Sequence, residues 1–137
     1  MSPLVLKNIP AKVDNDKTLQ LINSTHQPSE FFTLLKTLTN EDDKEISDWL
    51  NISLKTFKSY KTENKNTKRH LTEHAIMLLS LYKHGIQIYG TAEQFKNWLE
   101  GNNFYFDNKA PIKFMDTISG IKFIDDRLTA MEFGDNA

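Results

Sequence analysis

Apolar residues recur at intervals of three and four along the chain from residue 29 onward, a spacing typical of amphipathic helices. Sustained alternation of apolar and polar residues, which would indicate strands, is not seen in any segment. We therefore expect an all-α fold with few strands. The pattern predicts helices over residues 29–38, 42–50, 53–62, 71–89, 91–101 and 118–131, and a short further helix that begins at Pro111.

Residues that start or stop helices divide this pattern. Gly90 ends the strongest predicted helix, and Thr91 begins a capping box for the next. Gly85 lies inside the strongest helix and weakens the expectation that this helix is unbroken. Residues 1–28 hold three prolines and only a short apolar cluster at 19–22, so we expect a weakly structured N-terminal extension with one short helix at most.

The segment 46–60 has the spacing of a helix-turn-helix. The first helix of that motif must approach the second closely, so one inner position needs a small side chain, and Ser47 fits. Four residues later the turn needs a left-handed backbone, which Asn51 tolerates better than most residues. The motif's small core would then be filled by Ile46, Leu50, Ile52, Phe57 and Tyr60.

The second helix of this motif carries the candidate DNA-binding residues. Residues 53–70 hold six basic side chains and one acid, whereas the rest of the chain is acidic, although the formal net charge is only −1. A basic strip of this kind suits the DNA backbone, but a solvated helical hairpin is the alternative interpretation. The residues that we expect to face the major groove or its phosphates are Ser53, Lys55, Thr56, Lys58, Ser59 and Lys61.

Composition excludes several other classes of protein. The chain has 137 residues and no cysteine, which rules out disulfides and thiolate metal sites and suits a reducing cytoplasm. It has no apolar run long enough to span a membrane and no signal peptide, so we expect a cytoplasmic protein. A phosphate-binding loop and a nucleophile elbow are also absent, and we expect neither an enzyme nor a bound cofactor.

Two sets of titratable residues have spacings that do not suit a metal site or an acid–base pair. His70 and His74 lie four residues apart, but a third metal ligand is not evident, so we expect two exposed histidines and no metal site. The adjacent carboxylates at 42–43 and 125–126 would point in different directions on a helix and would not form an acid–base pair.

From about residue 40 onward, several landmarks recur in a fixed order. Ile88-Tyr89-Gly90 closes one helix, and Gly120 lies near the start of the last. The further landmarks are Phe95, Trp98-Leu99, Pro111-Ile112, Met115-Asp116-Thr117 and the closing group Met131-Glu132-Phe133-Gly134. With these landmarks the chain resembles the Xre/MbcA/ParS family of type II antitoxins, which are typically encoded beside a RES-domain toxin.

The resemblance implies a DNA-binding, dimerising and autorepressing N-terminal module of the Cro/Xre type and a C-terminal toxin-binding domain. The partners would be operator DNA, a second copy of the chain and a RES-domain toxin that degrades NAD. The antitoxin's C-terminus would cover the toxin's NAD site. The implied toxin-binding residues are Met131, Glu132, Phe133, Gly134, Asp135, Asn136 and Ala137.

The chain is predicted to consist of an N-terminal extension and two domains. Residues 1–28 form the extension, 29–90 the helix-turn-helix domain and 91–137 the toxin-binding domain. Where this family usually has a glycine-bearing loop, between Leu99 and Pro111, this chain has the aromatic run Phe104-Tyr105-Phe106. The alternative function is that of a stand-alone helix-turn-helix transcriptional regulator with no toxin partner.

Overall fold

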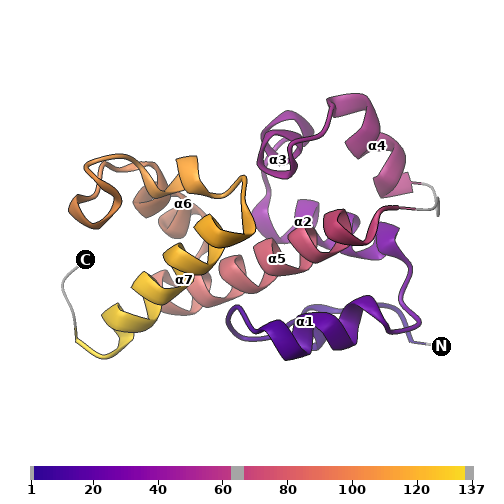
Figure 1. Ribbon diagram of the computed structural model, residues 1–137, viewed down its shortest axis with the longest axis horizontal. Helices are drawn as coiled ribbons and strands as arrows, with labels where there is room; N and C mark the ends of the chain where they lie inside the picture. The colour runs from indigo at the N-terminus through magenta and orange to yellow at the C-terminus, as the bar shows by residue number, and fades with distance from the viewer. Residues whose placement is uncertain (1, 63–66, 135–137) are drawn as a thin grey trace.

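The computed structural model describes residues 2–62 and 67–134, and within them the fold is entirely helical (Figure 1). An isolated bridge between Asn103 and Lys109 is the nearest approach to a strand in these ranges. The all-α prediction is therefore confirmed. The helices are α1 (Asn15–Ile22), α2 (Pro28–Thr39), α3 (Asp43–Leu50), α4 (Leu54–Thr62), α5 (Arg69–Tyr89), α6 (Ala92–Glu100) and α7 (Ile118–Glu132), and the short 3-10 helices are η1 (Leu6–Asn8), η2 (Phe104–Phe106) and η3 (Pro111–Phe114).

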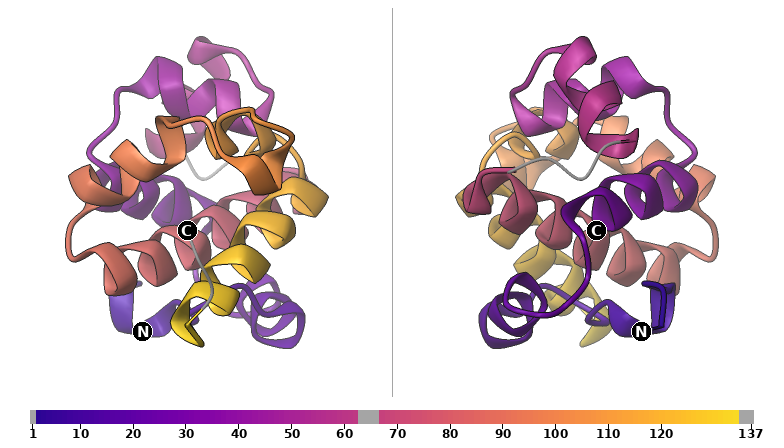
Figure 2. Two further views of the ribbon diagram at one scale, coloured as in Figure 1. Left: turned by 90° about the vertical axis from the view of Figure 1, so that its left-hand side faces the viewer. Right: turned by 90° about the vertical axis from the view of Figure 1, so that its right-hand side faces the viewer.

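The helix α5 lies at the centre of the molecule and is surrounded by the others. Helices α1, α2, α6 and α7 all pack against it, with α1 on the side opposite α3 and α4 (Figures 1 and 2). Thirteen of its residues are buried, including polar ones such as Thr72 and Ser80. A helix that is covered by other helices on every side is buried all round, so the buried part of α5 extends beyond one apolar face.

Gly85 does not interrupt α5. The helix is continuous from Arg69 to Tyr89, and at Gly85 the aromatic ring of Phe95 from α6 lies directly against the backbone. A Cβ atom built at this position would lie 2.4 Å from two of the ring atoms. The glycine therefore allows α5 and α6 to approach each other closely, a role that its low helix propensity did not indicate.

The first 28 residues contain more structure than their composition predicts. They form η1 and α1, and the side chains of Ile9 and Thr18 are 2% and 1% exposed. Lys83 of α5 donates from Nζ to the carbonyls of Leu6 and Ile9, at 3.0 and 2.8 Å. These bonds join residues more than 70 positions apart, so local sequence patterns gave no sign of them.

Helix starts follow the capping signals, with two differences from the prediction. α2 begins at Pro28 rather than after Ser29, and the carboxylate of Glu30 accepts a hydrogen bond from the Gln27 backbone at 2.7 Å. Proline suits this first position because its missing N–H needs no partner there. α5 begins at Arg69, two residues earlier than expected.

In the described ranges no helix combines the length and the apolar character needed to cross a bilayer.

We expect Gly85→Ala to lower the free energy of unfolding by about 1–3 kcal/mol, because the added methyl group overpacks the contact with buried Phe95. The higher helix propensity of alanine offsets only about 1 kcal/mol of this loss of stability. Urea unfolding of both proteins measures the difference.

Gly101→Ala is the matched control. Its nearest neighbours would be 3.8 Å from the new Cβ, and its backbone has φ −82°, which any residue adopts. A stability loss at Gly101 as large as that at Gly85, or none at Gly85, would contradict the close-packing explanation.

Candidate functional site

Helices α3 and α4 and the turn between them have the geometry predicted for a helix-turn-helix. Ser47 is fully buried where the helices meet, and Asn51 has the left-handed backbone, with φ 56° and ψ 40°. Ile46, Leu50 and Phe57 form the buried centre of the unit, each 1% exposed or less. The structure of α3, the turn and α4 therefore confirms the register that the sequence predicts.

Asn51 has a second role that a glycine could not perform. Its side-chain amide donates a hydrogen bond to the backbone carbonyl of Asp116, at 2.8 Å, between η3 and α7. The turn of the helix-turn-helix is thus bonded to a residue 65 positions further along the chain. This bond gives a physical reason for asparagine at a position that usually takes glycine.

The predicted DNA-facing residues differ in how far their side chains are exposed. Ser53, Lys55 and Lys58 are exposed, and the Ser53 hydroxyl accepts a hydrogen bond from the Thr56 backbone at 3.1 Å, as a capping residue does. Thr56 is half-buried, and the hydroxyl oxygen of Ser59 is buried. The surface that α4 offers therefore centres on its first turn and Lys58.

Lys61 lies apart from this surface. Its ammonium group is 2.9 Å from both carboxylate oxygens of Asp43 and 5.5 Å from the ring centre of Phe57. Burial alone would raise the pKa of Asp43, but Lys61, with help from Lys36, lowers it below the ordinary value. Lys61 therefore joins the end of α4 to the start of α3.

A buried histidine joins α5 to the C-terminal end of α7. The ring of His84 is 2% exposed; its Nδ1 lies 2.8 Å from Asp125, and its Nε2 bonds Glu132. Sequence reasoning missed this group, which we call the histidine clasp (His84, Asp125 and Glu132). The signal that was available is the spacing of Asp125 and Glu132, two helical turns apart and so on one face of α7.

The two carboxylates control the charge of the histidine. Burial lowers the pKa of His84, but the hydrogen bonds and negative charges of Asp125 and Glu132 outweigh it and raise the pKa above the ordinary value. In the protonated ring both nitrogens donate, one to each carboxylate. The ring then has no free nitrogen to accept a proton, so this arrangement holds two helices together and does not form a general base.

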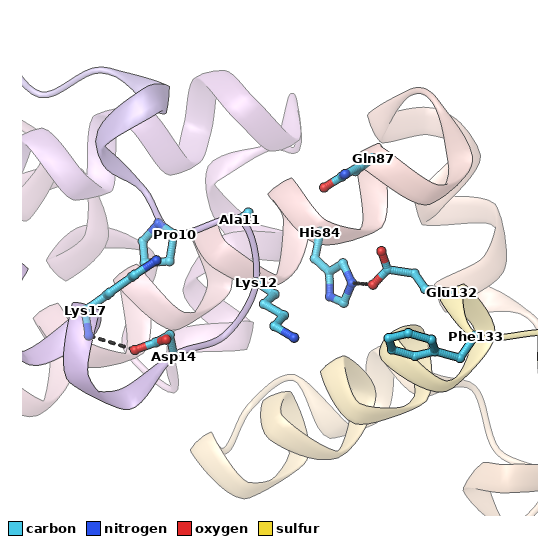
Figure 3. Close-up of a pocket in the computed structure, with 9 residues that line it drawn as sticks. All are labelled: Pro10, Ala11, Lys12, Asp14, Lys17, His84, Gln87, Glu132 and Phe133. Atoms are coloured by element: carbon cyan, nitrogen blue, oxygen red, sulfur yellow. Dashed lines mark hydrogen bonds and ion pairs between the residues drawn. The ribbon is translucent and has the colours of Figure 1, made fainter.

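The histidine clasp lies at one side of a pocket of about 340 Å³. The opposite side comes from the N-terminal segment, from which Lys12 extends toward the His84–Glu132 pair and Phe133 (Figure 3). Glu132 is therefore partly open to the pocket, with 37% of its side chain exposed. The full lining is Pro10, Ala11, Lys12, Asp14, Lys17, His84, Gln87, Glu132 and Phe133.

The predicted toxin-binding residues divide into an anchored and a projecting part. Met131 is half-buried, with its sulfur 3.8 Å from the Tyr89 hydroxyl, and Glu132 belongs to the histidine clasp. Phe133 is 87% exposed, and Gly134 follows with φ 96°. Asp135, Asn136 and Ala137 lie outside the described residues.

The expectation that His74 is exposed was wrong. His74 is 7% exposed, and its Nε2 hydrogen-bonds the carbonyl of Met115 at 3.0 Å. Burial lowers its pKa, so the neutral ring with a proton on Nε2 fits this site. The prediction failed because the side of α5 that carries His74 is covered by η3 and its flanks. His70 is exposed, and among the described residues no group of three histidine or acidic side chains is arranged so that it could hold a metal ion.

The raised pKa of His84 predicts how stability depends on pH. The stabilisation from protonated His84 is fully present below its unfolded pKa of about 6.5 and is lost as the pH rises through the higher folded value. NMR titration of the His84 ring should therefore give a midpoint above 6.5. Glu132→Gln removes one of the two negative charges and should lower that midpoint.

Asp126→Asn is the matched control for this titration, because Asp126 is the exposed neighbour of Asp125 on α7. It should leave the midpoint nearly unchanged. A wild-type midpoint at or below the ordinary histidine value, or equal effects of the two variants, would show that the histidine clasp does not form in solution.

Comparison with known proteins finds one similarity, at this end of the molecule. Residues 84–134 match the model of the antitoxin Xre/MbcA/ParS C-terminal toxin-binding domain. A search of curated proteins found no significant match. The matched region begins at His84 of the histidine clasp and ends at Gly134, and it includes every landmark used for the resemblance from Ile88 onward. Residues 84–134 are therefore similar to the toxin-binding domain of the Xre/MbcA/ParS antitoxins.

Proposed function

We propose that this protein is a type II antitoxin that neutralises a RES-domain, NAD-degrading toxin by placing its C-terminal residues over the toxin's active site. The observation that carries the proposal is the end of the family-matched region. Its last helix is held by the histidine clasp, while the next side chain, Phe133, is 87% exposed. A residue that projects from an anchored helix can enter a partner's cleft without disturbing the antitoxin's own core.

Charge at the same end supports an NAD site as the target. Glu132 places a carboxylate beside Phe133, and Asp135 follows in the sequence. A site built to bind a pyrophosphate favours negative charge. Because Glu132 also bonds His84, the antitoxin holds this carboxylate in one position before it meets the toxin. The protein then acts by binding, with no chemical step of its own.

The test is co-expression with the product of the neighbouring reading frame, comparing the full chain with a variant that lacks residues 133–137. This deletion keeps Met131 and Glu132, so the packing of α7 and the histidine clasp are retained. We expect the deletion to abolish or strongly reduce protection of cell growth. Thermal unfolding of the purified variant checks that it remains folded.

Undiminished protection by a folded deletion variant would contradict the active-site-covering mechanism. A full chain that gives no protection against the neighbouring product would contradict the antitoxin function itself.

We also propose that α4 binds operator DNA and that the protein represses its own operon as a homodimer. Lys55 and Lys58 are exposed on α4, with the Ser53 cap at the end that would approach the DNA backbone. Helix-turn-helix proteins commonly read two half-sites with a two-fold dimer. A cytoplasmic location belongs to this proposal, since the DNA lies there.

The combined variant Lys55→Ala with Lys58→Ala should weaken binding to a duplex from the protein's own promoter. Each lost phosphate contact reduces the salt dependence of binding by about one unit of slope, so we expect a reduction of about two. Fluorescence anisotropy across a series of salt concentrations measures both quantities.

Lys109→Ala with Lys113→Ala is the matched control, because it removes two exposed lysines from the loop and η3 region away from α4 (Figure 1). Equal affinities and slopes for both double variants would show that the assigned face of α4 does not contact DNA.

A further inference from the structure

The exposed aromatic side chains are concentrated in one region. Among the described residues, the large apolar side chains that are exposed outside the family-matched region are aliphatic: Val5, Leu6 and Leu19. The exposed aromatic ones all lie within residues 84–134. They are Phe104, Tyr105, Phe123 and Phe133, with exposed fractions of 79%, 41%, 48% and 87%.

Three of these side chains lie on η2 and on the neighbouring face of α7, and we call them the aromatic platform (Phe104, Tyr105 and Phe123). The rings of Phe104 and Tyr105 have centroids 5.6 Å apart in an edge-on arrangement. Phe123 of α7 reaches the group through the buried ring of Phe106, at 5.0 Å. Phe133 is separate, at the far end of α7.

The loop that presents the platform is held in one conformation. Phe106 points inward and is 1% exposed, so η2 directs its neighbours Phe104 and Tyr105 outward. The Asn103 side chain accepts a hydrogen bond from the Tyr105 backbone at 2.9 Å, and the Asn103 N–H bonds the Lys109 carbonyl at 3.1 Å. A loop ordered in this way loses little entropy when it binds a partner.

A buried arginine supports the platform from the side of α7, because Arg127 is only 9% exposed. The guanidinium carbon of Arg127 lies 3.6 Å from the ring centroid of Tyr105, a stacked cation–π arrangement. Arg127 follows Phe123 by one helical turn, so both lie on the face of α7 that is turned toward η2. Arg127 therefore fixes the position of Tyr105, and aromatic side chains such as those of the platform are enriched at protein interfaces.

Two observations favour a protein partner over nucleic acid here. The charges around the platform are mixed: Lys109 and Asp107 lie in its loop, and Asp126 is exposed on α7. A nucleic-acid surface needs a predominantly basic field. The platform also lies within the region whose family is described as toxin-binding, at the end of the molecule away from α4 (Figure 1).

We propose that the aromatic platform is a second docking surface for the toxin, which packs an apolar-lined part of its surface against Phe104, Tyr105 and Phe123. This surface is separate from the C-terminal residues that cover the active site. The inference rests on the proposed antitoxin function. It places much of the affinity in the platform, while the projecting C-terminus supplies inhibition.

Isothermal titration calorimetry of the full chain with the purified product of the neighbouring reading frame tests the proposal. Phe104→Ser should weaken binding roughly tenfold or more, as expected for a residue that dominates an interface. Adding Phe123→Ser should weaken it further. Phe104 is 79% exposed, so its replacement leaves the core intact even if Phe123→Ser lowers stability.

Leu19→Ser is the matched control, because Leu19 is also a large exposed apolar residue, 52% exposed, but lies on α1 outside the matched region. It should change the affinity less than twofold. Phe104→Ser should also leave DNA binding and the sedimentation coefficient of the antitoxin alone unchanged.

Several results would overturn the proposal. Toxin affinity unchanged by Phe104→Ser would remove the platform from the toxin interface while leaving the antitoxin function intact. A variant that loses DNA binding would assign the platform to nucleic acid, and one that dissociates a dimer would assign it to a second copy of the chain. No binding by the wild-type chain would overturn the proposed function as well.

Discussion

The burial of α5 on all sides is the constraint on which the rest of the structure depends. A helix of 21 residues with apolar and small polar side chains around its whole circumference must be covered everywhere, and the other helices provide that cover. Close approach is possible because Gly85 leaves room for the ring of Phe95. The helix-turn-helix and the family-matched region therefore share one hydrophobic core.

Polar contacts then fix the positions of the helix-turn-helix and of the family-matched region relative to this core. The amide of Asn51 bonds the Asp116 carbonyl, and Lys96 of α6 lies 2.7 Å from a carboxylate oxygen of Glu41, just before α3. At the other end, His84 holds α7 through two carboxylates. The buried contact between His84 and Asp125 is costly to break, because removing one partner leaves the charge of the other uncompensated.

Local sequence signals predicted the helices and the helix-turn-helix register, because capping residues, helical spacing and the left-handed Asn51 act over a few residues. They failed where distant residues decide the outcome. Thr18 and His74 are buried by segments that only the fold brings near. The histidine clasp joins positions 41 and 48 residues apart, and Lys61 turns toward Asp43 rather than outward.

The continuity of α5 also fixes the distance between α4 and the histidine clasp. At 1.5 Å per residue its 21 residues extend over about 32 Å, with α4 near its first turns and the histidine clasp near its last. A helix packed on every side resists bending, so it acts as a rigid spacer between the two ends of the molecule. Any two-fold arrangement that sets the separation of two α4 helices thereby also sets the separation and direction of the two α7 helices.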